Sequence, residues 1–208
     1  MKLTHPLLIS ILTISSVLPA ATVDDLTFTL NGDSTEYSVS DCNQNASDSL
    51  VIPNTYNGLP VTSIGSSAFA ACRSITSVTI PDSVTSIGNS AFEDCNDLTY
   101  VTIPDSVTSI GFKAFRACTS LISMTIPDSV TSIGDRAFRA CTSLTSVTIG
   151  DGVTSIEDFT FANCSSLASV TIPDSVNSIA FNVFDNCTSL NSLSFSNPLL
   201  EAAAAERD

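Results

Sequence analysis

Tryptophan is absent from this 208-residue sequence, and histidine occurs only once, as His5. Serine and cysteine proteases and most zinc enzymes need an imidazole, either as a general base or as a metal ligand. Basic residues are also scarce, because seven Lys and Arg stand against 21 Asp and Glu, for a net charge of −14. A surface with this charge repels phosphate backbones and anionic lipids. The composition therefore disfavours nucleic-acid binding, and a single histidine argues against histidine-dependent catalysis.

The first 21 residues have the layout of a secretory signal peptide. Lys2 gives a positive start, residues 6–18 are mostly apolar, and Pro19, Ala20 and Ala21 offer small residues for cleavage. A buried N-terminal helix is the alternative interpretation. No later stretch reaches the ~20 apolar residues of a membrane-spanning helix. We therefore expect an exported protein, secreted or associated with the cell surface, whose mature form lacks His5 and every site that needs histidine.

A period of 23 residues runs through most of the chain. Three residue types recur at this step over residues 61–198, without insertion or deletion, and define six repeats. They are Ile64, Ile87, Ile110, Ile133, Ile156 and Ile179; Phe69, Phe92, Phe115, Phe138, Phe161 and Phe184; and Cys72, Cys95, Cys118, Cys141, Cys164 and Cys187. One repeat cannot bury its apolar residues alone, whereas stacked repeats bury them in a continuous core. The sequence therefore predicts a solenoid.

Each coil of this solenoid is expected to contain two short strands, a turn and a helical segment. Val101 and Ile103 alternate with polar residues, as in a strand with one buried face. Residues 104–106 (Pro-Asp-Ser) favour a turn, and residues 107–110 are expected to be extended. Residues 114–121 have the apolar spacing of a helical turn. The predicted fold class is an α/β repeat solenoid, a right-handed coil with parallel β-strands and short helical turns.

The two ends of the array differ from the repeats, as the terminal units of a solenoid must. Residues 26–30 and 37–39 flank an Asn-Gly-Asp turn and predict a β-hairpin. Residues 22–60 are interpreted as this capping hairpin followed by a variant first coil. Residues 199–208 are interpreted as a C-terminal capping helix or tail, because the Asn-Pro pair before them favours a helix start.

The motif of the repeat resembles that of a known family. L-x-x-V-x-I-P followed by V-x-x-I-G-x-x-A-F-x-x-C is similar to the BspA-like leucine-rich repeats of bacterial and protist surface proteins, over residues 61–195. The resemblance implies a secreted or surface-exposed protein that takes part in adhesion or protein binding, without catalytic activity. A recognition or adhesion module is therefore the expected function.

The outward strand positions are the most uniform surface and the first candidate binding site. They are Ser77, Thr79, Tyr100, Thr102, Ser123, Thr125, Ser146, Thr148, Ser169 and Thr171. Such hydroxyl columns on a solenoid are expected to meet a protein or a glycan. The alternative function is that of a structural or ice-binding surface protein that works through the same Ser and Thr columns. Serine and threonine also simply suit an exposed strand.

Two further groups of residues are candidates for surface interactions. Four of the seven basic residues are expected to form one docking patch for an acidic partner, namely Lys113, Arg116, Arg136 and Arg139. A solvated surface, partly paired with carboxylates, is the alternative. Asn45, Asn163 and Asn186 begin N-glycosylation sequons, which have meaning only in a eukaryotic secretory pathway. Asn45 is the most favourable of the three, since the other two adjoin predicted core cysteines.

The repeated cysteines and aspartates are assigned structural roles. Equivalent cysteines stacked in parallel lie too far apart for disulfides, so we expect the six repeat cysteines to be buried thiols. Cys42 lies outside the array and can be free. One Asp per coil supplies too few oxygen ligands for calcium, and turn formation accounts for the column of Asp82, Asp105, Asp128, Asp151 and Asp174. We predict no metal site, no cofactor, no enzymatic activity and a monomer.

The fifth repeat departs from the pattern. Gly150 and Gly152 replace the Pro and Ser of the turn, and Glu157 and Thr160 replace a Gly and an Ala. Glycine increases the entropy lost on folding and loosens a turn. Phe159 follows where other repeats carry polar residues and is expected to point outward. Residues 150–161 are therefore expected to be the least protected part of the array away from its ends.

Overall fold

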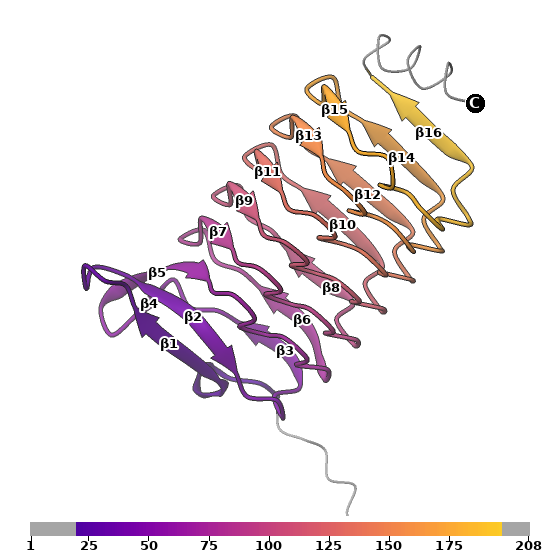
Figure 1. The fold of residues 1–208 in the computed structure, drawn as a ribbon. Coiled ribbons are helices and arrows are strands. Elements are labelled where there is room, and N and C mark those ends of the chain that lie inside the picture. Colours follow the sequence, from indigo (N-terminus) through magenta and orange to yellow (C-terminus); the bar gives the residue numbers. More distant parts are fainter. Residues whose placement is uncertain (1–19, 197–208) are drawn as a thin grey trace, which may run out of the picture.

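The computed structural model describes residues 20–196, which form an elongated β-solenoid of about seven turns (Figure 1). Successive coils stack from the indigo N-terminal hairpin to the yellow strand at the other end. Nearly all of the expected signal peptide, and the whole of the expected C-terminal helix at 199–208, lie outside the described residues.

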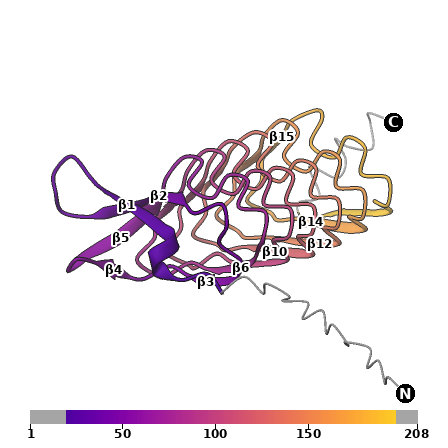
Figure 2. The same cartoon turned by 90° about the horizontal axis from the view of Figure 1, so that it is seen from below.

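Each coil contributes one strand to each of two rows, which lie on opposite sides of the stack (Figure 2). The first row comprises β3 (Asp48–Val51), β6 (Ile75–Thr79), β8 (Tyr100–Thr102), β10 (Ser123–Ile126), β12 (Ser146–Ile149), β14 (Ser169–Ile172) and β16 (Ser192–Phe195). The second row comprises β5 (Leu59–Ile64), β7 (Ser86–Ile87), β9 (Ser109–Ile110), β11 (Ser132–Ile133), β13 (Ser155–Ile156) and β15 (Ser178–Ile179). From β5 and β6 onward the paired strands are parallel and join residues 23 positions apart, as Val78 pairs with Val101.

The N-terminal hairpin of the sequence prediction is present. After a 3₁₀ turn at Val23–Asp25, β1 (Leu26–Leu30) pairs antiparallel with β2 (Tyr37–Cys42). β2 then pairs in parallel with β5, and the short β4 (Thr55–Tyr56) pairs antiparallel with β5. The Phe28 ring stacks on Tyr56 with 4.1 Å between the centroids. The hairpin thus joins the second strand row and is held to it by aromatic packing.

The expected helical turns are wrong. In each coil the segment around the repeated Phe is a series of tight turns. In the first five repeats it contains two left-handed residues four positions apart, such as Ser67 (φ 60°) and Ala71 (φ 59°). Alternate amides bond to the next coil: the Phe69 N–H donates to the Ala91 carbonyl at 2.7 Å. The amides between them close turns within the segment, as Ala70 does on Ser67 at 3.0 Å.

This bonding explains why no α-helix forms. A helix uses its amides internally, so it would leave nothing to bond to the neighbouring coil at these positions. The series of turns keeps half of the amides for that purpose. Among residues 20–196 the only helical element is the 3₁₀ turn Val23–Asp25, so the fold is all-β rather than α/β.

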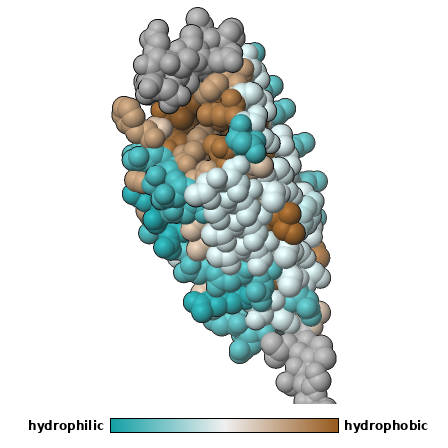
Figure 3. Space-filling model, turned by 90° about the vertical axis from the view of Figure 1, so that its right-hand side faces the viewer, coloured by the Kyte–Doolittle hydropathy of each residue, from teal (hydrophilic) through white to brown (hydrophobic). Residues whose placement is uncertain are grey.

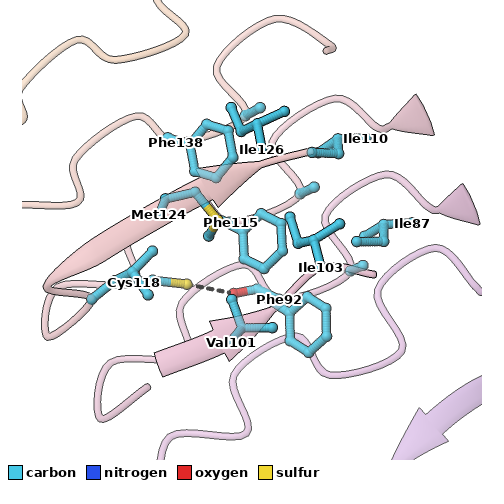
Figure 4. Close-up of a cluster of buried hydrophobic side chains, with 14 of the residues drawn as sticks. Ile87, Phe92, Val101, Ile103, Ile110, Phe115, Cys118, Met124, Ile126 and Phe138 are labelled. Carbon is cyan, nitrogen blue, oxygen red and sulfur yellow. Dashed lines mark hydrogen bonds between the residues drawn. The ribbon is translucent and has the colours of Figure 1, made fainter. Parts of the chain in front are cut away.

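A column of phenylalanines runs along the core. Phe69, Phe92, Phe115, Phe138 and Phe161 are fully buried. Neighbouring rings, Phe184 included, stack nearly parallel, with centroid separations that rise from 4.8 Å at the N-terminal pair to 5.8 Å at the C-terminal pair. Figure 4 shows Phe92, Phe115 and Phe138 in this column, with Val101 and Ile103 beside them. The inward assignment of these residues is confirmed.

The glycine before the turn segment, present in the first four repeats, serves close approach rather than a bend. A Cβ added to Gly111 would lie 2.6 Å from the backbone of Gly88, and one added to Gly134 would lie 2.5 Å from the Phe112 nitrogen. The amide of each of these glycines donates to the preceding coil, as Gly134 does to the Ile110 carbonyl at 2.8 Å. Glycine therefore suits this close approach, and in the sixth repeat Ala180 makes the equivalent bond, to the Ile156 carbonyl at 3.0 Å.

Glu157 occupies this glycine position in the fifth repeat, and the second strand row is interrupted there. β11 and β13 are not paired, although β9–β11 and β13–β15 are. Within residues 20–196, neither Thr154 N–H nor Glu157 N–H finds a backbone acceptor, whereas Thr131 N–H and Gly134 N–H do. We call this interruption the seam. Its position agrees with the departure of the fifth repeat from the pattern.

The last coil leaves part of the core uncovered among the described residues. Phe181 is 88% exposed and Leu193 is 41% exposed, and the side chains of Phe184 and Phe195 are only half-buried. Figure 3 shows apolar surface gathered at this end of the molecule. The inner-coil equivalents of Phe184, Leu193 and Phe195 are buried because the next coil covers them, whereas Phe181 lies at an outward position, as Phe112 does.

Truncation of Phe115 should be far more damaging than truncation of Phe112. Phe115 is fully buried between Phe92 and Phe138, so Phe115→Ala should lower the free energy of unfolding by ~3–5 kcal/mol. Phe112 is 38% exposed, and Phe112→Ala should cost within ~1 kcal/mol. Urea denaturation of both variants measures the difference. Equal losses would contradict the inward and outward assignment.

The seam should appear in amide hydrogen exchange. Thr154 and Glu157 should exchange at least about tenfold faster than Thr131 and Gly134, because their amides lack an acceptor in the preceding coil. Gly134→Glu serves as a matched variant, because it places the residue of the seam at Gly134, where a new Cβ would collide with the coil before it. Residues 131–134 should then exchange as fast as residues 154–157. Equal protection at both places in the unmodified protein would show that the seam has no energetic effect.

Candidate functional site

The outward side chains of the first strand row form straight columns, because the strands pair in register. Thr79 pairs with Thr102, and Thr125 pairs with Thr148, which in turn pairs with Thr171. We call the outward surface of β6, β8, β10, β12 and β14 the strand face. The ten candidate residues of the sequence analysis all lie on this surface, as strand periodicity predicted.

Tyr100 breaks the uniformity of the strand face. It pairs with Ser77 and is 55% exposed, the one large side chain among the small hydroxyl residues. The hydrogen-bonded row is also interrupted beside it, because β3-β6-β8 and β10-β12-β14-β16 are separate sheets. The strand face is therefore not one continuous flat ladder.

A hollow of about 500 Å³ lies at this interruption. Its residues come from three neighbouring coils, and they combine an aromatic ring, hydroxyl groups and carboxylates. The polar and aromatic lining residues are Tyr100, Thr102, Asp105, Ser123, Thr125, Asp128, Thr148 and Asp151. Among the candidate residues, Tyr100, Thr102, Ser123, Thr125 and Thr148 meet here, whereas Ser77, Thr79, Ser146, Ser169 and Thr171 lie outside the hollow.

The repeated aspartates, which were predicted from the sequence only to form turns, border this hollow. Asp105, Asp128 and Asp151 line one side, and Asp128 Oδ1 also accepts a hydrogen bond from the Asp151 amide at 2.9 Å. Gly150 allows this contact, because a Cβ there would lie 2.6 Å from the Asp128 nitrogen. The hollow has no basic lining residue. Its electrostatic potential therefore favours neutral or cationic groups.

The four basic residues of the predicted patch do lie on adjacent coils, but their surroundings differ. Arg116 Nη1 binds Glu93 Oε1 at 2.6 Å. Burial raises the pKa of Glu93, but hydrogen bonds from Ser90 and Arg116 outweigh it, so the net pKa is lowered. Arg139 makes no ion pair among the described residues, and its buried Nε lacks a hydrogen-bond partner.

The other two basic side chains pack on aromatic rings. Lys113 Nζ lies 4.8 Å from the centroid of Phe112, and the Arg136 guanidinium lies 5.9 Å from Phe112 and 5.0 Å from Phe159. Phe159 is thus half-buried against Arg136 rather than pointing freely into solvent. Arg136 Nη1 also lies 3.8 Å from Asp135 Oδ2. The patch is therefore a mixed aromatic and cationic surface that is partly paired with carboxylates, and the charge pattern alone did not predict its aromatic part.

The three sequon asparagines differ in their surroundings. Asn45 is exposed in the loop after β2. Asn163 is half-buried, and its side-chain oxygen accepts a hydrogen bond from the Asn186 amide at 3.1 Å. A glycan on either Asn163 or Asn186 would have to fit beside this bond, so Asn45 stays the most favourable acceptor.

The repeat cysteines are buried free thiols, as expected. Each thiol from Cys95 onward donates to a phenylalanine carbonyl 26 positions earlier, with distances of 2.9–3.2 Å. Figure 4 shows one such bond, from Cys118 to the Phe92 carbonyl. Burial raises the pKa of Cys141 to about 12 and also raises the pKa of its four neighbours in the column, Cys95, Cys118, Cys164 and Cys187. These thiols are therefore unreactive near neutral pH.

Among residues 20–196, no group of three or more His, Cys, Asp or Glu side chains is arranged so that it could hold a metal ion. In the same part of the chain, no helix is long and apolar enough to cross a membrane.

The BspA-type leucine-rich-repeat model matches residues 40–138 and 108–203, in six copies. The chain belongs to this family. Its members are typically non-enzymatic repeat proteins. None of the curated proteins matches this BspA-type chain.

Three solved structures illustrate the likeness. A leucine-rich-repeat protein of T. pallidum shares the fold at 24% identity, with a TM-score of 0.66 over 90% of this chain and 95% of that one. A Bacteroides ovatus leucine-rich-repeat protein is 30% identical (TM-score 0.64), and a Faecalibacterium prausnitzii leucine-rich cell surface protein is 32% identical (TM-score 0.61). Each of these two matches covers 83% of this chain but only about half of the other, 52% and 53% respectively.

The thiol column should make the protein sensitive to alkali. An unfolded cysteine ionises near pH 8.5, whereas a fully buried thiol such as Cys141 keeps its proton up to about pH 12. Between these values the unfolded chain releases protons that the folded chain retains. The free energy of unfolding should therefore fall by about 1.4 kcal/mol per pH unit for each such thiol. Urea midpoints should be constant at pH 6–8 and decline above about pH 9.

Cys141→Ala is the matched variant for this test. It removes one thiol from the titration, so its stability should decline less steeply with pH than that of the unmodified protein. The same slope in both proteins would contradict the assignment of the alkaline loss to the buried thiols.

Proposed function

We propose that this BspA-type chain is an exported or surface-displayed recognition module that binds a protein or glycan partner through its strand face. The observation that carries the proposal is the hollow at Tyr100, where the uniform columns give way to a shaped and chemically mixed site. Ligand sites of this kind combine concavity with an aromatic side chain and a few convergent polar groups. The cell-surface description of the Faecalibacterium relative supports the exported location.

The lining of the hollow restricts the chemistry of the partner. Tyr100 offers an exposed ring on which a sugar face or an aliphatic side chain can stack. Three carboxylates accept hydrogen bonds, and the threonine hydroxyls both donate and accept them. Phosphorylated or sulfated ligands would meet three negative charges without a basic residue to offset them. Neutral glycans and basic peptide segments fit this set of groups.

Ice binding is the second candidate, because threonines of the strand face stand in register from coil to coil. The interruption between β8 and β10 and the projecting Tyr100 ring count against a continuous flat contact with a crystal. Inhibition of ice recrystallisation separates this function from ligand recognition.

Binding to an array of neutral glycans and to basic and acidic peptides tests the proposal. Tyr100→Ser gives β8 the same residue that β6 has at the paired position, Ser77. Asp128→Asn removes one negative charge from the hollow. Each should weaken binding about tenfold or more if it removes a contact worth ~1.4 kcal/mol. Thr171→Ser, on the strand face but outside the hollow, should leave binding unchanged.

Two outcomes would reject the hollow as the site. One is binding that survives both substitutions. The other is binding that Arg136→Ala abolishes, which would move recognition to the aromatic and cationic patch. Preference for acidic peptides would favour the patch as well.

A further inference from the structure

The thiol column ends on a cysteine that does not belong to the repeats. Cys42 is the last residue of β2, where the hairpin leads into the first coil, and it is buried, as Cys72 is. The Cys72 sulfur lies 3.6 Å from the Cys42 carbonyl oxygen. The two cysteines are 30 residues apart, not 23, so Cys42 approaches the column from a strand rather than from an equivalent turn.

Cys72 also differs from the other five repeat cysteines in its partner. Those five thiols donate to phenylalanine carbonyls at 2.9–3.2 Å. Cys72 has no such phenylalanine, and its thiol instead donates to the Cys42 carbonyl oxygen at 3.6 Å and also interacts with the Cys42 thiol. This is a contact between two sulfur-bearing side chains that the parallel stacking of equivalent residues does not impose.

We propose that Cys42 and Cys72 form a disulfide, by exchange with a small-molecule disulfide of the oxidised glutathione class. The Cys72 thiolate attacks one sulfur of that molecule, forms a mixed disulfide and expels a thiolate. The Cys42 thiol then loses its proton and attacks the Cys72 sulfur, and a second thiolate leaves. Two protein thiols are oxidised and one small disulfide is reduced to two thiols. This cross-link is independent of the ligand that the strand face binds.

The order of attack follows from the hydrogen bond between the two thiols. The bond from Cys42 lowers the pKa of Cys72, whereas the same interaction, together with burial, raises the pKa of Cys42. Cys72 is therefore the more readily ionised thiol and the first nucleophile. Gln44 is the exposed residue above it, with its Nε2 bonded to the Ala70 carbonyl at 3.0 Å and 3.7 Å from the Cys72 sulfur. Cys72 is fully buried, so this side chain must move aside before a small disulfide can reach the thiol.

The cross-link would join the hairpin to the array. It closes residues 42–72, which contain β3, β4 and β5, and so ties the end of β2 to the start of the first repeat. Closing a loop of this length restricts the unfolded chain. The N-terminal end of the stack, where a coil has a neighbour on one side only, would then resist fraying.

Mass spectrometry of the full chain after incubation with oxidised glutathione tests the proposal. The oxidised protein should be lighter by two hydrogens, and iodoacetamide should label five of its seven cysteines after unfolding without reductant. No Lys or Arg lies between the two cysteines, but Asp48 does, so cleavage before aspartate separates them unless they are joined. The cross-linked fragment should combine the peptide that begins at Asp41 with the one that begins at Asp48. The melting temperature should rise by roughly 5–15 °C.

Cys42→Ser and Cys72→Ser should abolish both the cross-link and the rise in melting temperature. Cys118→Ser is the matched control: it removes a buried column thiol that bonds to the Phe92 carbonyl, and it should retain the cross-link. Seven labelled cysteines in the unmodified protein after oxidation would overturn the proposal. So would a cross-link that maps to any other pair of cysteines.

Discussion

Hydrogen bonds between each coil and its copy 23 residues later are the constraint on which the rest of this solenoid depends. They run along both strand rows and through the turn segments, where alternate amides reach the next coil. Every backbone position must then lie directly above its equivalent, so side chains stack on side chains of the same kind. The phenylalanine column, the thiol column and the glycine column are three results of this one requirement.

The same constraint shapes the surface. Where equivalent residues are identical, the exposed strand positions are uniform columns of hydroxyl groups that distinguish no particular ligand. Individual character arises only where a residue departs from its column, as Tyr100 does on the strand face and as Phe112 and Phe159 do on the turn side. Both candidate surfaces of this protein coincide with such departures. If the proposed function holds, the exceptions to the repeat carry the information for recognition.

Much of the architecture was predictable from the sequence, because the period and the alternation of Val101 and Ile103 reflect burial directly. The turn segments were not, since the apolar spacing at Phe115 and Cys118 suits a helix as well as a series of turns, and only the neighbouring coil decides between them. The hollow was also missed, because it needs the separation of β8 from β10 as well as the presence of Tyr100. Such features depend on contacts between coils, which a pattern within one coil does not encode.

The strict register has a consequence for how proteins of this kind change over generations. Inserting or deleting a single residue within a coil would shift every later residue of that coil off its column, and the glycine contacts leave no slack to absorb the shift. Within the 23-residue repeats, length should therefore change by whole coils, whereas composition can change freely at outward positions. The first coil lies outside this rule, because Ser49 pairs with Ser77, 28 positions later. A new specificity can arise when a coil is duplicated and its exposed residues then change, while its buried residues stay fixed by contact with the coils on either side.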